Sequence, residues 1–179
     1  MKGVILHGGH GTRLRPLTHT GPKQLIPVAN KPISQYVLED LRNSGIRDIA
    51  IILGDLSPEK VKQYYKNGEE FDVNLTYIQQ DRPAGIAHAV GLAENFTKNS
   101  PFVAYLGDNL LKGGISKFVK EFQQQNYDTM ILLQSGKPPA IRSGPVQRKG
   151  KISETYRKAK GTTKQLRTNR NILLHTKNL

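Results

Sequence analysis

A glycine-rich loop directly follows the first apolar run of the chain and limits the folds that this sequence can adopt. Residues 3–6 are typical of a short buried strand and lead into His7-Gly8-Gly9-His10-Gly11-Thr12-Arg13. Glycines let backbone N–H groups approach phosphate oxygens, and Arg13 and Arg15 add charged donors. The loop lacks the Gly-Lys-Ser/Thr ending of a Walker loop and the spacing of a dinucleotide fingerprint. Taken alone, it fits a phosphate-binding loop or a glycine-rich turn with surface arginines.

Apolar runs alternate with amphipathic stretches up to residue 133, which predicts an α/β fold. Because the expected strands are mostly apolar and alternate with helices, the sheet should be Rossmann-like, doubly wound and mostly parallel. Ligands of such sheets lie beyond the carboxyl ends of the strands, where the glycine loop and Asp108 both fall. We expect Ser57 to cap a helix that has Pro58 at its first position. Strands are predicted at residues 3–6, 48–53, 74–79, 102–106 and 129–133, and helices at 33–43, 58 onward, 86–96 and 115–124.

The glycine loop is the first part of a longer motif. It continues as Pro16-Leu17-Thr18, then as Pro-Lys-Gln-Leu-Ile-Pro-Val at 22–28 and Asn-Lys-Pro at 30–32. This run resembles the G-G-x-G-T-R-L-x-P-x-T…P-K-x-L-x-P-V…K-P signature of the sugar-1-phosphate nucleotidyltransferases. His7 before the glycines and residues 17–22 are most similar to the long-type glucose-1-phosphate thymidylyltransferases. Segments 80–89 and 105–109 resemble later motifs of the same family, in the same order.

The resemblance implies an activity and a set of roles. A nucleotidyl group would pass from dTTP or UTP to glucose 1-phosphate, giving a dTDP-sugar and pyrophosphate. Arg13 and Lys23 would be catalytic by neutralising charge, and Asp108 would help to bind Mg²⁺ as the cofactor. Gln80 would contact the pyrimidine, and Gly85 would let the base approach the backbone. The implied nucleotide-binding residues are Leu6, Gly8, Gly9, Gly11, Thr12, Arg13, Gln80, Pro83 and Gly85.

Some of these residues also fit purely structural roles. Asp108 follows a predicted strand, so its carboxylate also fits an ordinary strand-end turn. We expect His7, His10 and His88 to be loop and packing residues rather than metal ligands or bases.

The net charge of +13 is concentrated in the tail. Residues 135–179 hold 12 of the 27 Lys and Arg and one of the 14 Asp and Glu, a net charge of +11, which leaves +2 on residues 1–134. We therefore expect a nucleotide-binding portion at 1–134 and a poorly ordered basic tail at 135–179. The chain has no cysteine and no apolar run of membrane-spanning length, so we expect a cytoplasmic protein without a membrane partner.

The resemblance covers residues 1–133 and then stops. Family members continue with an F-G-V-A segment and an E-K-P motif, which are absent from the tail. If the tail is back-translated and the frame is moved by one base, residues 134–147 can contain F-G-V-A and residues 157–179 can begin with E-K-P. We interpret this as a frameshift near residues 133–134. It predicts a truncated, largely inactive form whose sheet has lost its later strands and exposes an apolar edge.

A different class of function remains as the alternative. A nucleotide-binding module or pseudoenzyme with a basic tail would bind nucleic acid nonspecifically and in a salt-sensitive way. Against this, Tyr156 is the only aromatic residue of the tail, and no nucleic-acid motif is present. A homo-oligomer is compatible with the sequence.

Overall fold

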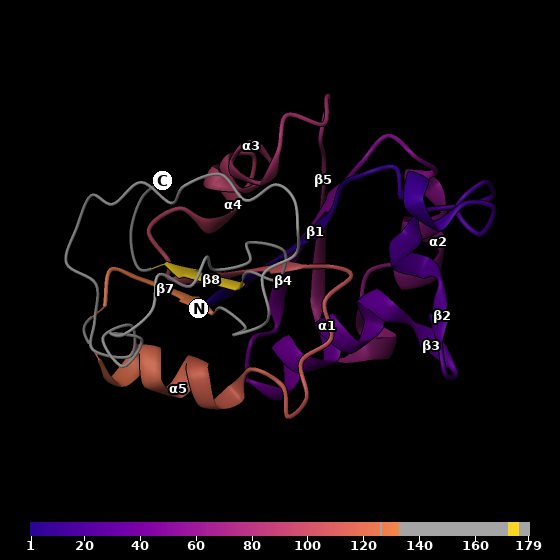
Figure 1. The fold of residues 1–179 in the computed structure, drawn as a ribbon. Coiled ribbons are helices and arrows are strands. Elements are labelled where there is room, and N and C mark those ends of the chain that lie inside the picture. The colour runs from indigo at the N-terminus through magenta and orange to yellow at the C-terminus, as the bar shows by residue number, and fades with distance from the viewer. Residues whose placement is uncertain (126, 133–171, 176–179) are drawn as a thin grey trace, which may run out of the picture.

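The computed structural model describes residues 1–125, 127–132 and 172–175, and within them six strands form one sheet. The strand order is β5-β4-β1-β6-β8-β7 (Figure 1). β1 pairs in parallel with β4 and β6, and β4 pairs in parallel with β5. The predicted mostly parallel sheet is therefore confirmed. The strands are β1 (Lys2–His7), β4 (Asp48–Leu53), β5 (Asn74–Gln79), β6 (Phe102–Leu106), β7 (Thr129–Leu132) and β8 (Ile172–His175).

Helices cover both faces of the sheet. Successive side chains of β1 point to opposite faces, and because they are apolar on each face, both faces must be covered. Ile5 of β1 packs into a core with residues of α1 (Ile33–Asn43), α2 (Pro58–Tyr65) and α5 (Ser116–Gln124). Val4 and Leu6 pack into a second core beneath α3 (Ile86–Gly91) and α4 (Glu94–Thr97). Figure 1 shows α3 and α4 on one side of the sheet and α1 and α5 on the other. This is the predicted doubly wound arrangement.

Two local predictions were wrong. The helix predicted at 86–96 is divided into α3 and α4, because the Ala93 N–H bonds to the carbonyl of Val90, three residues back, and not to a residue four back. Ser57 does occupy the N-cap position of α2, with Pro58 at the first turn, but its side chain makes no capping hydrogen bond. Its backbone is left-handed, with φ of 46°, and its carbonyl closes the first turn instead.

The tail contributes one described strand to the sheet. β8 lies between β6 and β7 and pairs antiparallel with both. Residues 102–105 of β6 are therefore paired, and β7 is the outer strand on this side of the described sheet, so the expected apolar edge stays a prediction. An unpaired strand edge leaves N–H and C=O groups unsatisfied, which β8 prevents here. The proposed boundary at residues 134–135 and the remainder of the tail lie outside the described residues.

Short elements complete the described chain. These are the hairpin of β2 (Pro27–Val28) and β3 (Lys31–Pro32), and the 3₁₀ turns η1 (Thr12–Leu14), η2 (Lys23–Leu25) and η3 (Glu69–Phe71). No helix in this part of the chain is long and apolar enough to cross a membrane.

A buried hydrogen bond ties the sheet to α1 and provides a test of the packing. The Tyr105 hydroxyl on β6 donates to Asp40 Oδ2 on α1 at 3.0 Å, and Tyr105 is fully buried. Tyr105→Phe should lower the free energy of unfolding by about 1–2 kcal/mol, because it leaves a half-buried carboxylate without its donor. Tyr64→Phe, which removes an exposed hydroxyl bonded to Gln35, is the control and should change it by less than about 0.5 kcal/mol. Equal losses in urea unfolding would contradict this packing.

Candidate functional site

Four segments meet at the carboxyl edge of the sheet because the strands that they follow are parallel. The glycine loop follows β1, Gly54 follows β4, Gln80 follows β5 and Gly107 follows β6. Backbone hydrogen bonds join neighbouring ends, from Gln80 N to the carbonyl of Leu53 at 2.8 Å and from Gly107 N to that of Leu6 at 2.9 Å. The fold therefore brings the glycine loop, Gln80 and Asp108 together.

The glycine loop is shaped by close approach as well as by its backbone angles. A Cβ on Gly8 would lie 2.9 Å from Gln80 Oε1, and one on Gly11 would lie 2.8 Å from Thr18 Cγ2. Gly9 and Gly11 have φ of 97° and 62°, in the left-handed region that favours glycine. The N–H groups of residues 9–13 make no hydrogen bond to any residue that the structure describes. The loop thus presents a row of free backbone donors.

Lys23 and Asp108 form an ion pair beside this loop. Lys23 Nζ lies 2.6 Å from Asp108 Oδ2, and the two side chains are 24% and 33% exposed. Lys23 begins η2, and its stem passes the loop, since a Cβ on Gly11 would lie 3.1 Å from Lys23 Cβ. The pair is accessible and lies next to the free N–H groups.

Gln80 lies on the other side of the loop and is held by a histidine. Its side chain is 5% exposed, and Nε2 donates to His88 Nδ1 at 3.2 Å. His88 Nε2 in turn lies 3.5 Å from Asp81 Oδ1. Sequence analysis treated His88 as a packing residue and missed this contact, which fixes the direction of the Gln80 amide. A histidine on the first turn of a helix, eight residues after the glutamine, was the only signal available.

The remaining predicted site residues differ in exposure. Leu6 is buried beneath the loop, whereas Thr12 and Arg13 are exposed on η1. Arg13 makes no ion pair with any described residue, so its charge is available. Gly85 precedes α3 with φ of 94°, and no atom lies within 4 Å of where its Cβ would be. Pro83 belongs to the same exposed turn, which leaves open space beside the backbone of Gly85.

Two buried polar side chains lie beneath the site. His7 is 3% exposed, its ring packs where a Cβ on Gly107 would lie, and its two nitrogens have no hydrogen-bond partner among the described residues. Burial lowers the pKa of His7 from 6.5 to about 3, although the charge of Asp108 acts in the opposite direction. Gln24 is 1% exposed and donates from Nε2 to the Gly8 carbonyl at 3.1 Å. His7 therefore adds no charge to the site at neutral pH.

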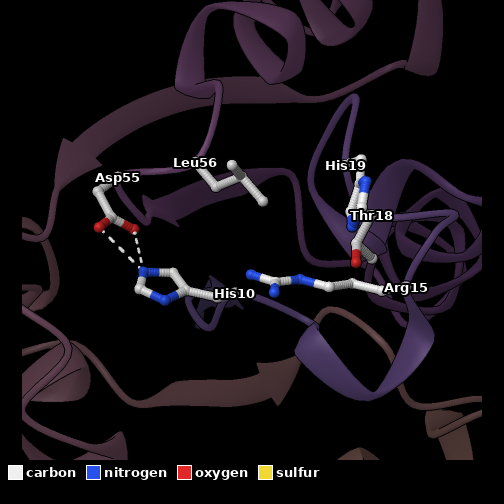
Figure 2. A pocket seen from close by; sticks show the side chains of 6 residues that line it. All are labelled: His10, Arg15, Thr18, His19, Asp55 and Leu56. Atoms are coloured by element: carbon white, nitrogen blue, oxygen red, sulfur yellow. Dashed lines mark hydrogen bonds and ion pairs between the residues drawn. The ribbon is translucent and has the colours of Figure 1, made fainter.

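An open hollow of about 570 Å³ lies on the β4 side of the glycine loop, and Figure 2 shows its lining. His10 Nε2 lies 2.9 Å and 3.0 Å from the two carboxylate oxygens of Asp55. The hydrogen bond with His10 lowers the pKa of Asp55. The Arg15 guanidinium points into the hollow between His10 and His19 (Figure 2). The lining residues are His10, Arg15, Thr18, His19, Asp55 and Leu56.

Asp108 is the carboxylate that the resemblance assigns to Mg²⁺. Within the described residues, no group of three or more His, Cys, Asp and Glu could hold a metal ion. Mg²⁺ is usually bound by one or two carboxylates together with substrate phosphates. A single accessible carboxylate beside a loop of free N–H groups fits that pattern.

Comparison with known proteins assigns this arrangement to a family. A family described as "Nucleotidyl transferase" matches residues 2–156. The chain belongs to this family. The match runs past residue 133, where the recognisable motifs end.

Characterised relatives match a large part of this chain. The low-salt glycan biosynthesis nucleotidyltransferase Agl11 of Haloferax volcanii is 48% identical over 139 residues, which is 78% of this chain and 39% of the relative. A glucose-1-phosphate thymidylyltransferase of Streptomyces antibioticus is 48% identical over 123 residues, 69% of this chain and 34% of the relative. The chain thus spans well under half the length of these relatives.

Solved structures share the fold. A Bacillus anthracis protein described as a glucose-1-phosphate thymidylyltransferase, in complex with a sucrose, has a TM-score of 0.81 and 35% identity, covering 98% of this chain and 72% of that one. A UDP-glucose pyrophosphorylase complexed with UDP-glucose has a TM-score of 0.62 and 23% identity, covering 73% and 55%. This second likeness concerns the fold alone.

The buried His7 makes the stability of this chain depend on pH. Its native pKa of about 3 lies below the ordinary 6.5, so between these values the unfolded chain binds a proton that the native chain does not. Stability therefore falls as the pH drops below 6.5. Relative to His7→Leu, the wild-type chain should lose about 2 kcal/mol of unfolding free energy between pH 7 and pH 5.

Urea unfolding of both proteins at the two pH values measures this difference. Parallel losses in the wild type and His7→Leu would show that His7 is not held neutral by burial.

Proposed function

We propose that this chain carries the nucleotide-binding side of an enzyme that transfers a nucleotidyl group from dTTP or UTP to glucose 1-phosphate. The products would be a dTDP-sugar, or its uridine counterpart, and pyrophosphate. The observation that carries the proposal is the Lys23–Asp108 pair, 2.6 Å apart, beside a loop with free N–H donors. Relatives named glucose-1-phosphate thymidylyltransferase support thymidine and glucose as the preferred groups.

The reaction would need alignment and charge neutralisation more than a base. A phosphate oxygen of glucose 1-phosphate would bond to the α-phosphorus, and the bond from that phosphorus to the β-phosphate oxygen would break. A phosphate monoester is already ionised at neutral pH, so no side chain must remove a proton. His7 is buried and its pKa is lowered to about 3, so it would be a poor base, which agrees with this. Arg13 and Lys23 would stabilise the charge on the phosphates.

Lys23 would change partners when the triphosphate binds. Its ammonium now contacts Asp108, and both groups are partly exposed. Mg²⁺ held by Asp108 and the phosphates would neutralise charge on the leaving pyrophosphate. Lys23 would then be free to contact a phosphate oxygen while its stem stays packed against Gly11.

The nucleobase would lie between Gln80 and the turn at Pro83 and Gly85. The amide of Gln80 is held by His88, so one amide hydrogen and the carbonyl oxygen stay in fixed directions. Amide groups of this kind can pair with the edge of a pyrimidine. The open space beside Gly85 would let the flat base contact the backbone.

We also propose that the tail arises from a frameshift near residues 133–134. In the shifted frame, the segment at 172–175 can read Tyr-Phe-Phe-Thr, which is as strand-like as the Ile-Leu-Leu-His that forms β8. Both frames can therefore supply a strand between β6 and β7. The shifted frame would also supply the E-K-P lysine that resemblance assigns to the sugar phosphate. The nucleic-acid alternative depends only on the charge of the tail, so we favour the transferase.

The proposed frameshift predicts a difference in activity. The 179-residue chain should form dTDP-glucose from dTTP and glucose 1-phosphate at a small fraction of the rate of the protein read in the other frame. Sequencing of the coding DNA beyond codon 133, followed by a pyrophosphate-release assay on both products, tests this. A coding sequence without F-G-V-A and E-K-P in the other frame would refute the frameshift.

The role of Asp108 can be tested by binding, without turnover. Asp108→Asn should weaken dTTP binding in the presence of Mg²⁺ about tenfold or more, because a charged ligand of the cation is lost. Without Mg²⁺, the same variant should bind dTTP at least as tightly as the wild type, because Lys23 is released from its ion pair. Isothermal titration calorimetry with and without Mg²⁺ measures both effects.

Glu69→Gln is the matched control for the loss of one negative charge. Glu69 is exposed on η3, which precedes β5 and so lies toward the opposite end of the sheet. The Glu69→Gln variant should bind dTTP as tightly as the wild type, both with and without Mg²⁺. An unchanged dependence on Mg²⁺ in Asp108→Asn would exclude Asp108 as the metal ligand.

A further inference from the structure

We propose that Thr18 and Gln24 are positioning residues that hold two carbonyls of the glycine loop and so direct the following N–H groups toward the triphosphate. The proposal rests on the proposed function, because it concerns how the loop binds phosphates. Neither residue was among the predicted site residues. Both are buried, with exposed fractions of 4% and 1%, so they would act through the loop and not by contacting the nucleotide.

Gln24 holds the first carbonyl. Its Nε2 donates to the Gly8 oxygen at 3.1 Å from beneath the loop. The peptide bond between Gly8 and Gly9 is trans, so its N–H points away from its C=O. The N–H of Gly9 therefore points away from the buried Gln24 side chain.

Thr18 holds the second carbonyl in the same way. Its Oγ1 donates to the Gly11 oxygen at 3.0 Å, and the Leu14 N–H bonds to the same oxygen at 2.8 Å. The trans peptide that follows directs the Thr12 N–H to the opposite side. The methyl group of Thr18 also fills the space beside Gly11, where a Cβ would lie 2.8 Å from it.

The two hydrogen bonds restrict the conformational freedom of the glycine-rich loop. Glycine has wide conformational freedom, so the peptide planes of residues 8–11 are easily rotated. Phosphate binding needs several N–H groups aimed at one place before the ligand arrives. Fixing the two carbonyls leaves the N–H groups of Gly9 and Thr12 without a partner among the described residues and turned outward.

The experiment separates the hydroxyl of Thr18 from its shape. Thr18→Val keeps the branched side chain and removes the donor, whereas Thr18→Ser keeps the donor and removes the methyl group. Gln24→Met removes the other donor at similar length. Each full-length variant is titrated with dTTP and with inorganic tripolyphosphate, and its thermal unfolding is recorded.

Thr18→Val and Gln24→Met should each bind both ligands about three- to tenfold more weakly, the equivalent of one hydrogen bond. Thr18→Ser should bind within about twofold of the wild type, because the donor is retained. A role in packing alone would give the reverse order for the two Thr18 variants, since valine fills the site better than serine.

The possible failures are distinguishable. If the wild type binds tripolyphosphate and Thr18→Val binds it equally well, the positioning role is wrong and the proposed function stands. Weakening in Thr18→Ser as large as in Thr18→Val would also overturn the positioning role. If the wild-type chain binds neither dTTP nor tripolyphosphate, the proposed function fails and this inference fails with it.

Discussion

β1 pairs in parallel with β4 on one side and with β6 on the other, so the chain leaves three adjacent strands at the same edge of the sheet. The strand is buried on both faces, because helices cover each side. Its continuation must therefore turn at the edge, and the glycines that begin there allow the turn and the close contact with Gln80. The segments that hold Gln80 and Asp108 arrive beside this turn for the same reason. The position of the site is a consequence of strand pairing.

The charges at this edge of the sheet depend on which ionisable side chains are buried. His7 lies under the site but is held neutral by burial, so it neither competes with Lys23 nor offers a cation to a phosphate. Lys23 and Asp108 are partly exposed and neutralise each other. Arg13, at the end of the loop, and Arg15 have no ion-pair partner among the described residues. A loop whose N–H groups have no partner among the described residues, with Lys23 paired and Arg13 and Arg15 unpaired there, suits a polyanion that brings its own metal ion.

Much of the fold was predictable from the sequence, because local sequence patterns determine the bounds of most elements. The bounds of α1, β4, β5 and β6 agree with the sequence prediction, since each is an apolar or periodic run that a turn signal ends. The break between α3 and α4, the left-handed Ser57 and the strand β8 were missed, because tertiary contacts decide them. The contacts of Thr18, Gln24 and His88 were missed for a related reason. Each joins a side chain to a group seven or more residues away at 3.0–3.2 Å, a separation at which the sequence does not show which groups will meet.

We propose that the described residues hold the nucleotide side of a nucleotidyl transferase site and that the groups for the sugar phosphate lie outside them. This agrees with a chain that spans 39% of one relative and 34% of another. The most direct test is to titrate the 179-residue protein separately with dTTP and with glucose 1-phosphate by calorimetry in the presence of Mg²⁺. The account predicts saturable binding of dTTP and no detectable binding of glucose 1-phosphate. Binding of glucose 1-phosphate without binding of dTTP would contradict it.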